Sequence, residues 1–225
     1  FDNHVVWQEE GKMLRCNWRH SVRTNVVDCD IQFGNVQRSV TENNLSEYAQ
    51  KEICAHKWIE VRSGNRGFSL INDCKYGYRA KGGWISMNVL RSTKSPDFAA
   101  DVGEHVFAFG AYISGEKDET QKFAYAFNHE VVPVSCGPVT FVTMSESDVV
   151  LETVKRAEQS NDVILRMYQS TGKHEAVCLN FDRKYSKIVE TDLMENDIGQ
   201  IGKNTDNVRL VFSEFEIKTI KLVKE

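Results

Sequence analysis

Apolar residues recur at every second position along much of this 225-residue chain. The alternating sets are Val27, Cys29, Ile31 and Phe33; Ile85, Met87 and Val89; Phe107, Phe109, Ala111 and Ile113; Val163, Leu165 and Met167; Val177, Leu179 and Phe181; Leu210 and Phe212. A period of two turns one face of each strand towards a core. Glycine-containing turn signals at 63–65, 81–83 and 170–172 separate some of these runs. We therefore predict an all-β fold built as an antiparallel β-sandwich.

Helical periodicity is sparse in comparison. Phe123 and Phe127 lie four residues apart, which predicts one short helix over Glu119 to Asn128. The segment from Asp148 to Gln159 fits both periods. We predict a strand there, because β-branched residues gather at its front end.

A change in composition divides the chain near Pro133 to Pro138. Tryptophan, glycine and aromatic turns are frequent before it, whereas short strands with few glycines follow it. We expect two domains, residues 1–137 and 138–225.

The bulk composition restricts the class of partner. Apolar residues make up 41% of the chain, enough for one large or two modest cores. A formal charge of −4 and a pI near 5.9 give no general attraction to nucleic acid or to anionic membranes. No apolar run approaches the roughly 18 residues that a membrane span needs. We therefore predict no nucleic-acid partner and no membrane partner. The chain starts with phenylalanine, so we also expect an excised or processed piece.

The six cysteines lie at positions 16, 29, 54, 74, 136 and 178, and no two form a CxxC pair. That spacing argues against a zinc knuckle. A disulfide framework stays possible, but a chain of this size does not need one. We predict reduced cysteines and a cytoplasmic protein.

Common catalytic motifs are missing from the sequence. The six histidines form neither HxH nor HxxxH, and no GxSxG nucleophile motif or glycine-rich phosphate loop is present. Thirty-two acidic residues guarantee chance pairs such as Asp97 and Asp101, and sequence spacing does not set the separation that glycosidase chemistry requires. We predict no catalytic residue and no metal ligand within this chain.

Two turns combine aromatic and planar polar groups, which suit the C–H faces and hydroxyls of sugars. They are His56-Lys57-Trp58 and Asn72-Asp73-Cys74-Lys75-Tyr76. The alternative is that Trp58 fills the core while Asp73 and Lys75 belong to a solvated turn.

Six groups of residues, in chain order, carry a family resemblance. They are Ile31-Gln32-Phe33-Gly34 with Val36-Gln37-Arg38; Ala55-His56-Lys57-Trp58; Leu70-Ile71-Asn72-Asp73-Cys74-Lys75-Tyr76-Gly77; Leu90-Arg91-Ser92 with Pro96-Asp97 and Ala100-Asp101-Val102-Gly103-Glu104-His105; Phe127-Asn128; and Glu152-Thr153-Val154-Lys155 with Leu165-Arg166-Met167-Tyr168. Together they resemble the C-terminal region of α-mannosidases of glycoside hydrolase family 38, of the cytosolic and bacterial type. The resemblance spans nearly the whole chain.

This resemblance implies a non-catalytic part of a zinc-dependent retaining glycosidase that hydrolyses terminal α-D-mannose residues. In the family, the zinc ion and the catalytic carboxylates lie in an N-terminal β/α barrel, which this chain lacks. Residues 1–137 would be the later part of a large sandwich related in fold to galactose mutarotase, and 138–225 a smaller terminal sandwich. The implied partners are the upstream barrel of the same polypeptide and, through the intact enzyme, α-mannosides. The fragment alone would be inactive.

The resemblance also implies which side chains form the rim of the substrate pocket. The rim candidates are Asn72, Asp73, Lys75, Tyr76, His56 and Trp58. Arg91, Asp101 and His105 would brace the loop through an ion pair or hydrogen bonds. The chain departs from the family pattern at Ser46 and at Gln50-Lys51, which leaves any contact by residues 43–52 in doubt.

Three other interpretations stay open. The chain could be an independent carbohydrate-binding module, or a purely structural or oligomerisation domain. A free-standing mutarotase-like enzyme needs a catalytic His and Glu, and no convincing pair stands out. Because a truncated sandwich leaves open strand edges, we also predict a homo-oligomer.

Overall fold

A computed structural model describes residues 1–116, 119–130, 135 and 140–224. The chain forms two compact units, residues 1–131 and 132–225, which are described separately below. The boundary predicted between Pro133 and Pro138 falls almost entirely outside the described residues, as does Cys136. Its position stays a prediction.

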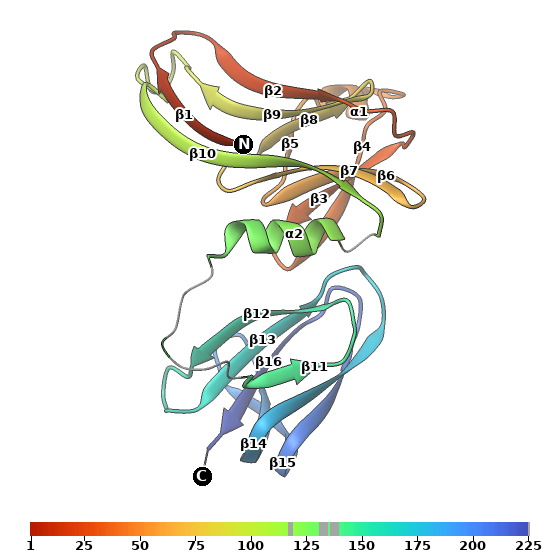
Figure 1. Ribbon diagram of the computed structural model, residues 1–225, viewed down its shortest axis with the longest axis vertical. Helices are drawn as coiled ribbons and strands as arrows, with labels where there is room; N and C mark the ends of the chain where they lie inside the picture. Colours follow the sequence, from red (N-terminus) through yellow and green to blue (C-terminus); the bar gives the residue numbers. More distant parts are fainter. Residues whose placement is uncertain (117–118, 131–134, 136–139, 225) are drawn as a thin grey trace. The chain divides into compact units, whose positions relative to one another are not determined.

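Unit 1 contains two antiparallel sheets, as the alternating pattern predicted (Figure 1). The six-stranded sheet has the order β1-β10-β7-β6-β3-β4. Its strands are β1 (Asp2–Trp7), β3 (Val26–Ile31), β4 (Gly34–Ser39), β6 (Trp58–Ser63), β7 (Arg66–Asn72) and β10 (Gly103–Ser114). The four-stranded sheet, ordered β2-β9-β8-β5, consists of β2 (Met13–Arg19), β5 (Ile53–Cys54), β8 (Gly77–Lys81) and β9 (Trp84–Arg91).

The inner faces of the two sheets supply one buried hydrophobic cluster. Ile85 and Met87 of β9 and Tyr78 of β8 are fully buried in it, together with Leu70 and Phe107 from the other sheet. The next residues along each strand face away from this core. The outer face of each sheet is therefore free to carry polar groups.

Two of the hairpins show how local sequence sets the turns. Gly82 and Gly83 both have positive φ, +60° and +78°, the pattern of the tight turn that favours two glycines between paired strands. Phe33, which the alternation placed on a strand, lies instead in the turn between β3 and β4 with φ +55°. Turn geometry therefore ends the strand at Ile31.

Helix α2 (Glu119–Asn128) has the bounds that the sequence predicted. It packs on the outer face of the six-stranded sheet, where Ala124 joins Trp58 and Ile71 in a second buried cluster. Helix α1 (Leu45–Ala49) was not predicted. It is only five residues long, is capped by the Asn44 side chain and buries no residue, so it leaves no apolar periodicity in the sequence.

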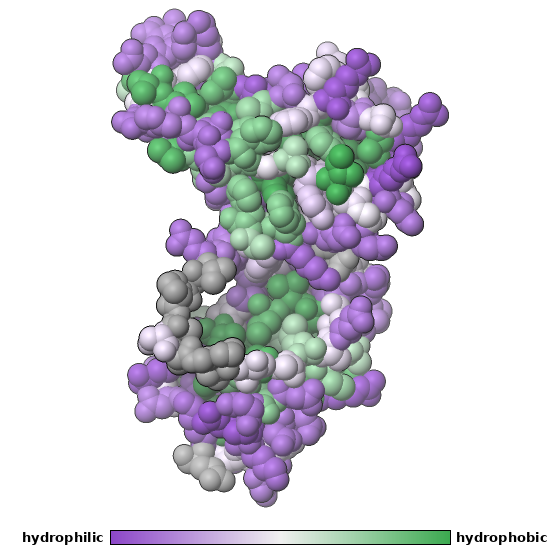
Figure 2. All heavy atoms as spheres, viewed as in Figure 1, coloured by the Kyte–Doolittle hydropathy of each residue, from purple (hydrophilic) through white to green (hydrophobic). Residues whose placement is uncertain are grey.

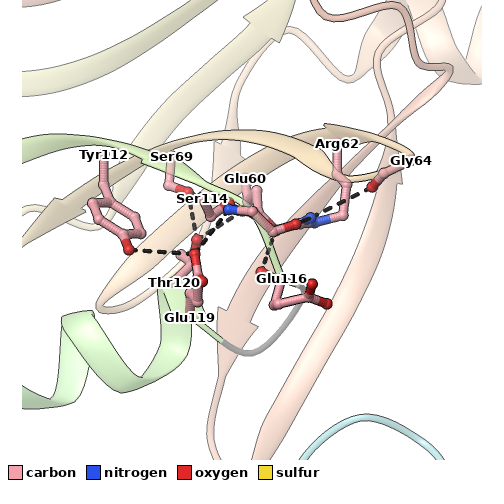
Figure 3. A network of polar contacts seen from close by, with 10 residues as sticks. Glu60, Arg62, Gly64, Ser69, Tyr112, Ser114, Glu116, Glu119 and Thr120 are labelled. Carbon is pink, nitrogen blue, oxygen red and sulfur yellow. Dashed lines mark hydrogen bonds and ion pairs between the residues drawn. The ribbon is translucent and has the colours of Figure 1, made fainter.

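A buried polar network lies between α2 and the sheet (Figure 3). The Oε1 atom of Glu60 accepts hydrogen bonds from Arg62 Nη2 at 3.0 Å, Thr120 Oγ1 at 2.7 Å and Ser114 Oγ at 2.5 Å. Ser69 Oγ donates to the same oxygen at 3.1 Å. The Arg62 guanidinium continues to backbone carbonyls of the segment that leads into α2. The network thus joins β6, β7 and β10 to the start of the helix.

Unit 2 is an antiparallel sheet ordered β11-β14-β16-β13-β12, with β15 paired to β14. Its strands are β11 (Val142–Met144), β12 (Val149–Arg156), β13 (Val163–Gln169), β14 (Glu175–Thr191), β15 (Asp197–Phe212) and β16 (Ile217–Val223). The strand predicted within 148–159 is confirmed as β12. Buried apolar residues, including Met167, Leu179 and Leu222, form its core.

Hydrophilic residues cover much of the visible surface, and apolar side chains reach it in patches (Figure 2). Ile113, near the end of β10, is 79% exposed, and Val106 on the same strand is equally open. In the described part of the chain, no helix has the length and apolar character required to cross a bilayer.

Candidate functional site

The loop between β7 and β8 is held from inside by Asn72. This residue is only 1% exposed, and its Nδ2 donates to the backbone carbonyl of His56 at 2.8 Å and to the Tyr78 hydroxyl. Its Oδ1 accepts from the backbone N–H of Lys75, a local Asx-type closure of the turn. The last residue of a strand thus fixes the conformation of the loop that follows.

Asp73 and Lys75 attach the same loop to β10. The Asp73 Oδ2 accepts from Ala108 N at 2.8 Å, which extends the β7–β10 pairing by a side-chain bond. The Lys75 ammonium lies 4.9 Å from the centre of the Phe107 ring, within the range of a cation–π contact. Asp73 is exposed and Lys75 is half-buried, so the turn meets solvent and is also attached to β10.

Tyr76 projects from the loop and is 52% exposed. Its ring lies 5.5 Å from that of the half-buried His56, with the planes tilted by 57°. Trp58, by contrast, is buried against Ile71 and Ala124 beneath α2. The structure therefore brings Tyr76 and His56 together at the surface and places Trp58 and Asn72 behind it.

A shallow groove of about 330 Å³ runs beside this loop. Lys75 and Tyr76 of the loop line it together with Arg91, Asp101 and, from β9, Asn88. The exposed Tyr76 ring thus shares one groove with two cations and an acid. Such a surface can stack on a ring and hydrogen-bond to hydroxyls.

The three residues predicted to brace the loop meet at Asp101, which has a positive φ of 57°. Its Oδ2 accepts from the backbone N–H of Arg91 at 2.5 Å, and its carbonyl lies 3.0 Å from His105 Nε2. The carboxylate therefore contacts the backbone of Arg91. The exposed Arg91 guanidinium forms no ion pair with any residue in the described ranges.

Ionisation around the loop follows from burial. Desolvation, helped by the neighbouring Asp73, raises the pKa of the Cys74 thiol to about 11. Burial is the main cause that raises the pKa of the Tyr78 hydroxyl above its usual range, and nearby thiol and carboxyl groups add to the shift. Both groups are therefore neutral near pH 7.

Within residues 1–116, 119–130, 135 and 140–224, no three His, Cys, Asp or Glu side chains are placed to hold a metal ion. The described residues therefore do not fit a zinc site.

Two sets of residues support the loop in roles that the sequence did not assign to them, although Asn128 and Gly77 belong to the motifs that carry the resemblance. Asn128, at the end of α2, donates to the carbonyl of Asn72 at 3.0 Å and so fastens the helix to the loop. Gly77 lies against Asn88, and an added Cβ would approach its Nδ2 to 3.0 Å. The small residue at the loop exit and the amide at the helix end were the available signals.

Two family profiles match this chain. Residues 1–99 match the profile described as the C-terminal domain of glycosyl hydrolases family 38. Residues 148–220 match the profile described as the C-terminal beta sandwich domain of the same family.

Curated relatives align with nearly the whole chain. Alpha-mannosidase 2C1 of Homo sapiens is 31% identical over 99% of this chain and 23% of its own length. Alpha-mannosidase G of Dictyostelium discoideum is 30% identical over 99% of this chain and 22% of its own length. The chain thus spans less than a quarter of these relatives. The crystal structure of an alpha-mannosidase from Enterococcus faecalis V583 superposes with a TM-score of 0.78 at 20% identity, over 98% of this chain and 27% of that protein, which supports the fold alone.

Proposed function

We propose that this chain, which belongs to glycosyl hydrolase family 38 and matches its C-terminal domains, is a non-catalytic β-domain part of an α-mannosidase. In this proposal it packs on an upstream catalytic barrel and forms part of the rim of the substrate pocket. The whole enzyme would hydrolyse terminal α-D-mannose residues.

The observation that carries the proposal is the groove in which Tyr76, Lys75 and Arg91 converge. Hydrogen bonds made by Asn72, Asp73 and Asn128 fix the backbone of the loop. Its exposed groups are not part of a hydrophobic core. A rigid loop that carries exposed aromatic and cationic groups suits a binding surface, because side chains that are already ordered lose little conformational entropy when a ligand binds.

Catalysis would belong to the missing barrel. A zinc ion held there would polarise sugar hydroxyls, and barrel carboxylates would carry out the glycosidase chemistry. The contribution of this chain would be orientation, which can supply a large part of the reduction in the barrier. Tyr76 and Lys75 would position the leaving-group side of the disaccharide.

The test uses the intact parent enzyme with an oligomannoside substrate. Tyr76→Phe and Lys75→Ala should each lower kcat/KM by about tenfold, the loss expected for one directed hydrogen bond, while the thermal midpoint stays unchanged. Tyr48→Phe and Lys184→Ala are matched controls, since neither residue lines the groove. Wild-type kinetics in both loop variants would show that the loop is structural.

We extend the proposal to the compartment and the assembly. The five described cysteines are free, which supports a reduced, cytoplasmic protein. The exposed Ile113 and Val106 on β10 support self-association of the isolated chain into a homo-oligomer. Light scattering during size-exclusion chromatography tests this, and a monomer at all concentrations would refute it.

An independent carbohydrate-binding module is the competing function. It requires the isolated chain to bind mannobiose, whereas the pocket-rim proposal expects little affinity, because most of the pocket would lie in the barrel. Titration calorimetry with mannobiose separates the two.

A further inference from the structure

A second groove, of about 380 Å³, lies on the outer face of the four-stranded sheet. Its lining consists of Arg15, Asn17, Arg79, Lys81, Trp84 and Ser86. All six come from β2, β8 and β9 or their ends, so the groove belongs wholly to unit 1. Neither the sequence motifs nor the proposed pocket rim involves it.

Strand register sets these side chains in two adjacent rows. Asn17 and Arg79 both pair with Ser86, one from each side. In the next row, Lys81 pairs with Trp84 across the Gly82–Gly83 turn. Residues two apart on a strand face the same side, so the rows are about 7 Å apart, close to the width of a sugar ring.

Four of the six side chains that line the groove have no polar partner among the described residues. Within the described ranges, the side chains of Asn17, Arg79, Ser86 and Trp84 form no hydrogen bond and no ion pair. Ser86 is only 4% exposed, but its hydroxyl is not closed off from solvent, so a ligand in the groove can reach it. The Trp84 ring is 44% exposed beside them.

The lining contains many donors and no carboxylate. Arg79, Lys81 and the Trp84 indole can only donate, and Ser86 and Asn17 can donate as well. Arg15 keeps one ion pair, to Glu52 at 2.8 Å. The nearly buried Lys81 ammonium donates to three backbone carbonyls, those of Thr41 at 2.7 Å, Ser39 at 3.3 Å and Glu47 at 3.3 Å. The Lys81 charge forms no salt bridge in the described part of the chain. A neutral sugar offers hydroxyls that also need acceptors, whereas this groove favours a ligand rich in acceptor oxygens.

We propose that this groove binds an anionic sugar, a sugar ring that carries a phosphate or sulfate ester. Trp84 stacks on the C–H face of the ring, and Arg79 donates to the ester oxygens. The Lys81 ammonium, held by three backbone carbonyls, contributes its positive charge to the groove without direct contact. Ser86 and Asn17 hydrogen-bond to the remaining oxygens between them. The site lies along β8 from the Tyr76 groove, about 13 Å away for the four residues from Gly77 to Lys81.

The test uses the 225-residue chain in solution. Mannose 6-phosphate, mannose 6-sulfate, mannose and inorganic phosphate are titrated by calorimetry, and the Trp84 indole and Ser86 amide signals are followed by NMR. Saturable binding of a sugar ester should shift both signals, and plain mannose and inorganic phosphate should bind at least about tenfold more weakly, since each lacks one part of the contact. The two esters distinguish phosphate from sulfate as the natural group.

Arg79→Gln and Trp84→Ala should each weaken binding of the ester by about tenfold or more, and both positions are exposed, so the fold should persist. Arg66→Gln, an exposed arginine on β7, is the matched control and should have no effect. Equal binding of mannose and its esters, equal binding of inorganic phosphate and the esters to the unmodified chain, or no saturable binding would each overturn the proposal. Because no mannosidase activity is measured, none of these results bears on the pocket rim.

Discussion

Gly67 on β7 has no room for a side chain, because the buried network occupies the space above it. A Cβ built there would lie well under 3 Å from both Ser114 Oγ and Glu60 Oε1, and 2.8 Å from Arg62 Nη2. Gly67 has an ordinary negative φ, so the constraint is purely steric. We predict that Gly67→Ala displaces the Glu60 carboxylate and breaks the network.

The cost follows from the bonds that Oε1 of Glu60 accepts. Three come from the hydroxyls of Ser69, Ser114 and Thr120, and one comes from Arg62. Three hydroxyl bonds at about 1 kcal/mol each amount to about 3 kcal/mol. This agrees with the 3–5 kcal/mol or so that separating a buried ion pair usually costs.

Urea unfolding followed by tryptophan fluorescence measures the effect. All four tryptophans, at positions 7, 18, 58 and 84, belong to unit 1, so the signal reports that unit alone. With a slope of about 1.5 kcal/mol per molar urea, the midpoint should fall by about 2 M. Gly115→Ala is the matched control, because its Cβ would meet only Glu119 at an ordinary 3.8 Å. It should be neutral or slightly stabilising.

A double-mutant cycle tests the cause. In a Glu60→Ala background the Gly67→Ala change should cost much less, because the carboxylate that it displaces is already gone. Equal costs in the two backgrounds, or a Gly67→Ala midpoint within error of the Gly115→Ala midpoint, would refute the steric argument.

Three further predictions concern the loop and unit 2. The rate of Cys74 alkylation, measured by peptide mass spectrometry, should rise with pH up to about 11. Asp73→Asn should move this rise to lower pH, because the Asp73 carboxylate helps to raise the pKa of the thiol. An unchanged pH profile in Asp73→Asn would contradict that contribution. Asn72→Ala should lower the unfolding free energy of unit 1 by about 2 kcal/mol, since it leaves several buried partners unpaired, and an unchanged urea midpoint would count against this anchor. The hydrogen bond from Lys155 holds the pKa of Glu195 below its usual 4.5, so this pair stabilises unit 2 above that pH and its contribution is lost as pH falls through the lowered value. In Glu195→Gln, the unfolding free energy of unit 2, measured by circular dichroism, should fall less steeply as the pH is lowered. An unchanged pH dependence would exclude the Lys155–Glu195 pair as the cause of that fall.

The strands could be predicted because their signal is local. Ile85 and Met87 alternate with polar neighbours, and burial of one face requires that pattern. Helix α2 could be predicted in the same way, from the four-residue spacing of Phe123 and Phe127. Helix α1 was not, because five residues with no buried side chain carry no periodic signal.

Glu60 shows where the alternating pattern gives the wrong environment. It lies between Ile59 and Val61, which face the core, so the pattern alone assigns it to solvent. The outer face of the sheet at that point is covered by α2, a segment almost sixty residues later. Burial of an outer face depends on tertiary packing and is invisible in a strand's own sequence.

The loop residues show the same limit at the level of roles. The run from Asn72 to Tyr76 was correctly singled out as an unusual turn, but its sequence does not say which side chain points inwards. The Asn72 amide is turned in by the His56 carbonyl and the Tyr78 hydroxyl, which three-dimensional pairing brings to it. Tyr76 and Lys75 are left as the groups that a ligand can reach.

Strand β8 connects the two grooves physically. Its inward residue Tyr78 bonds to Asn72 and thereby to the loop, whereas its outward residues Arg79 and Lys81 line the second groove. The strand is only five residues long and is paired on both sides, to β5 and β9. A change that shifts its register would move every side chain to the opposite face and would therefore disturb both grooves together. Substitutions that keep the register, such as those at Arg79 and Tyr76, should instead act on one groove each, which is why the two binding proposals can be tested independently on one sheet.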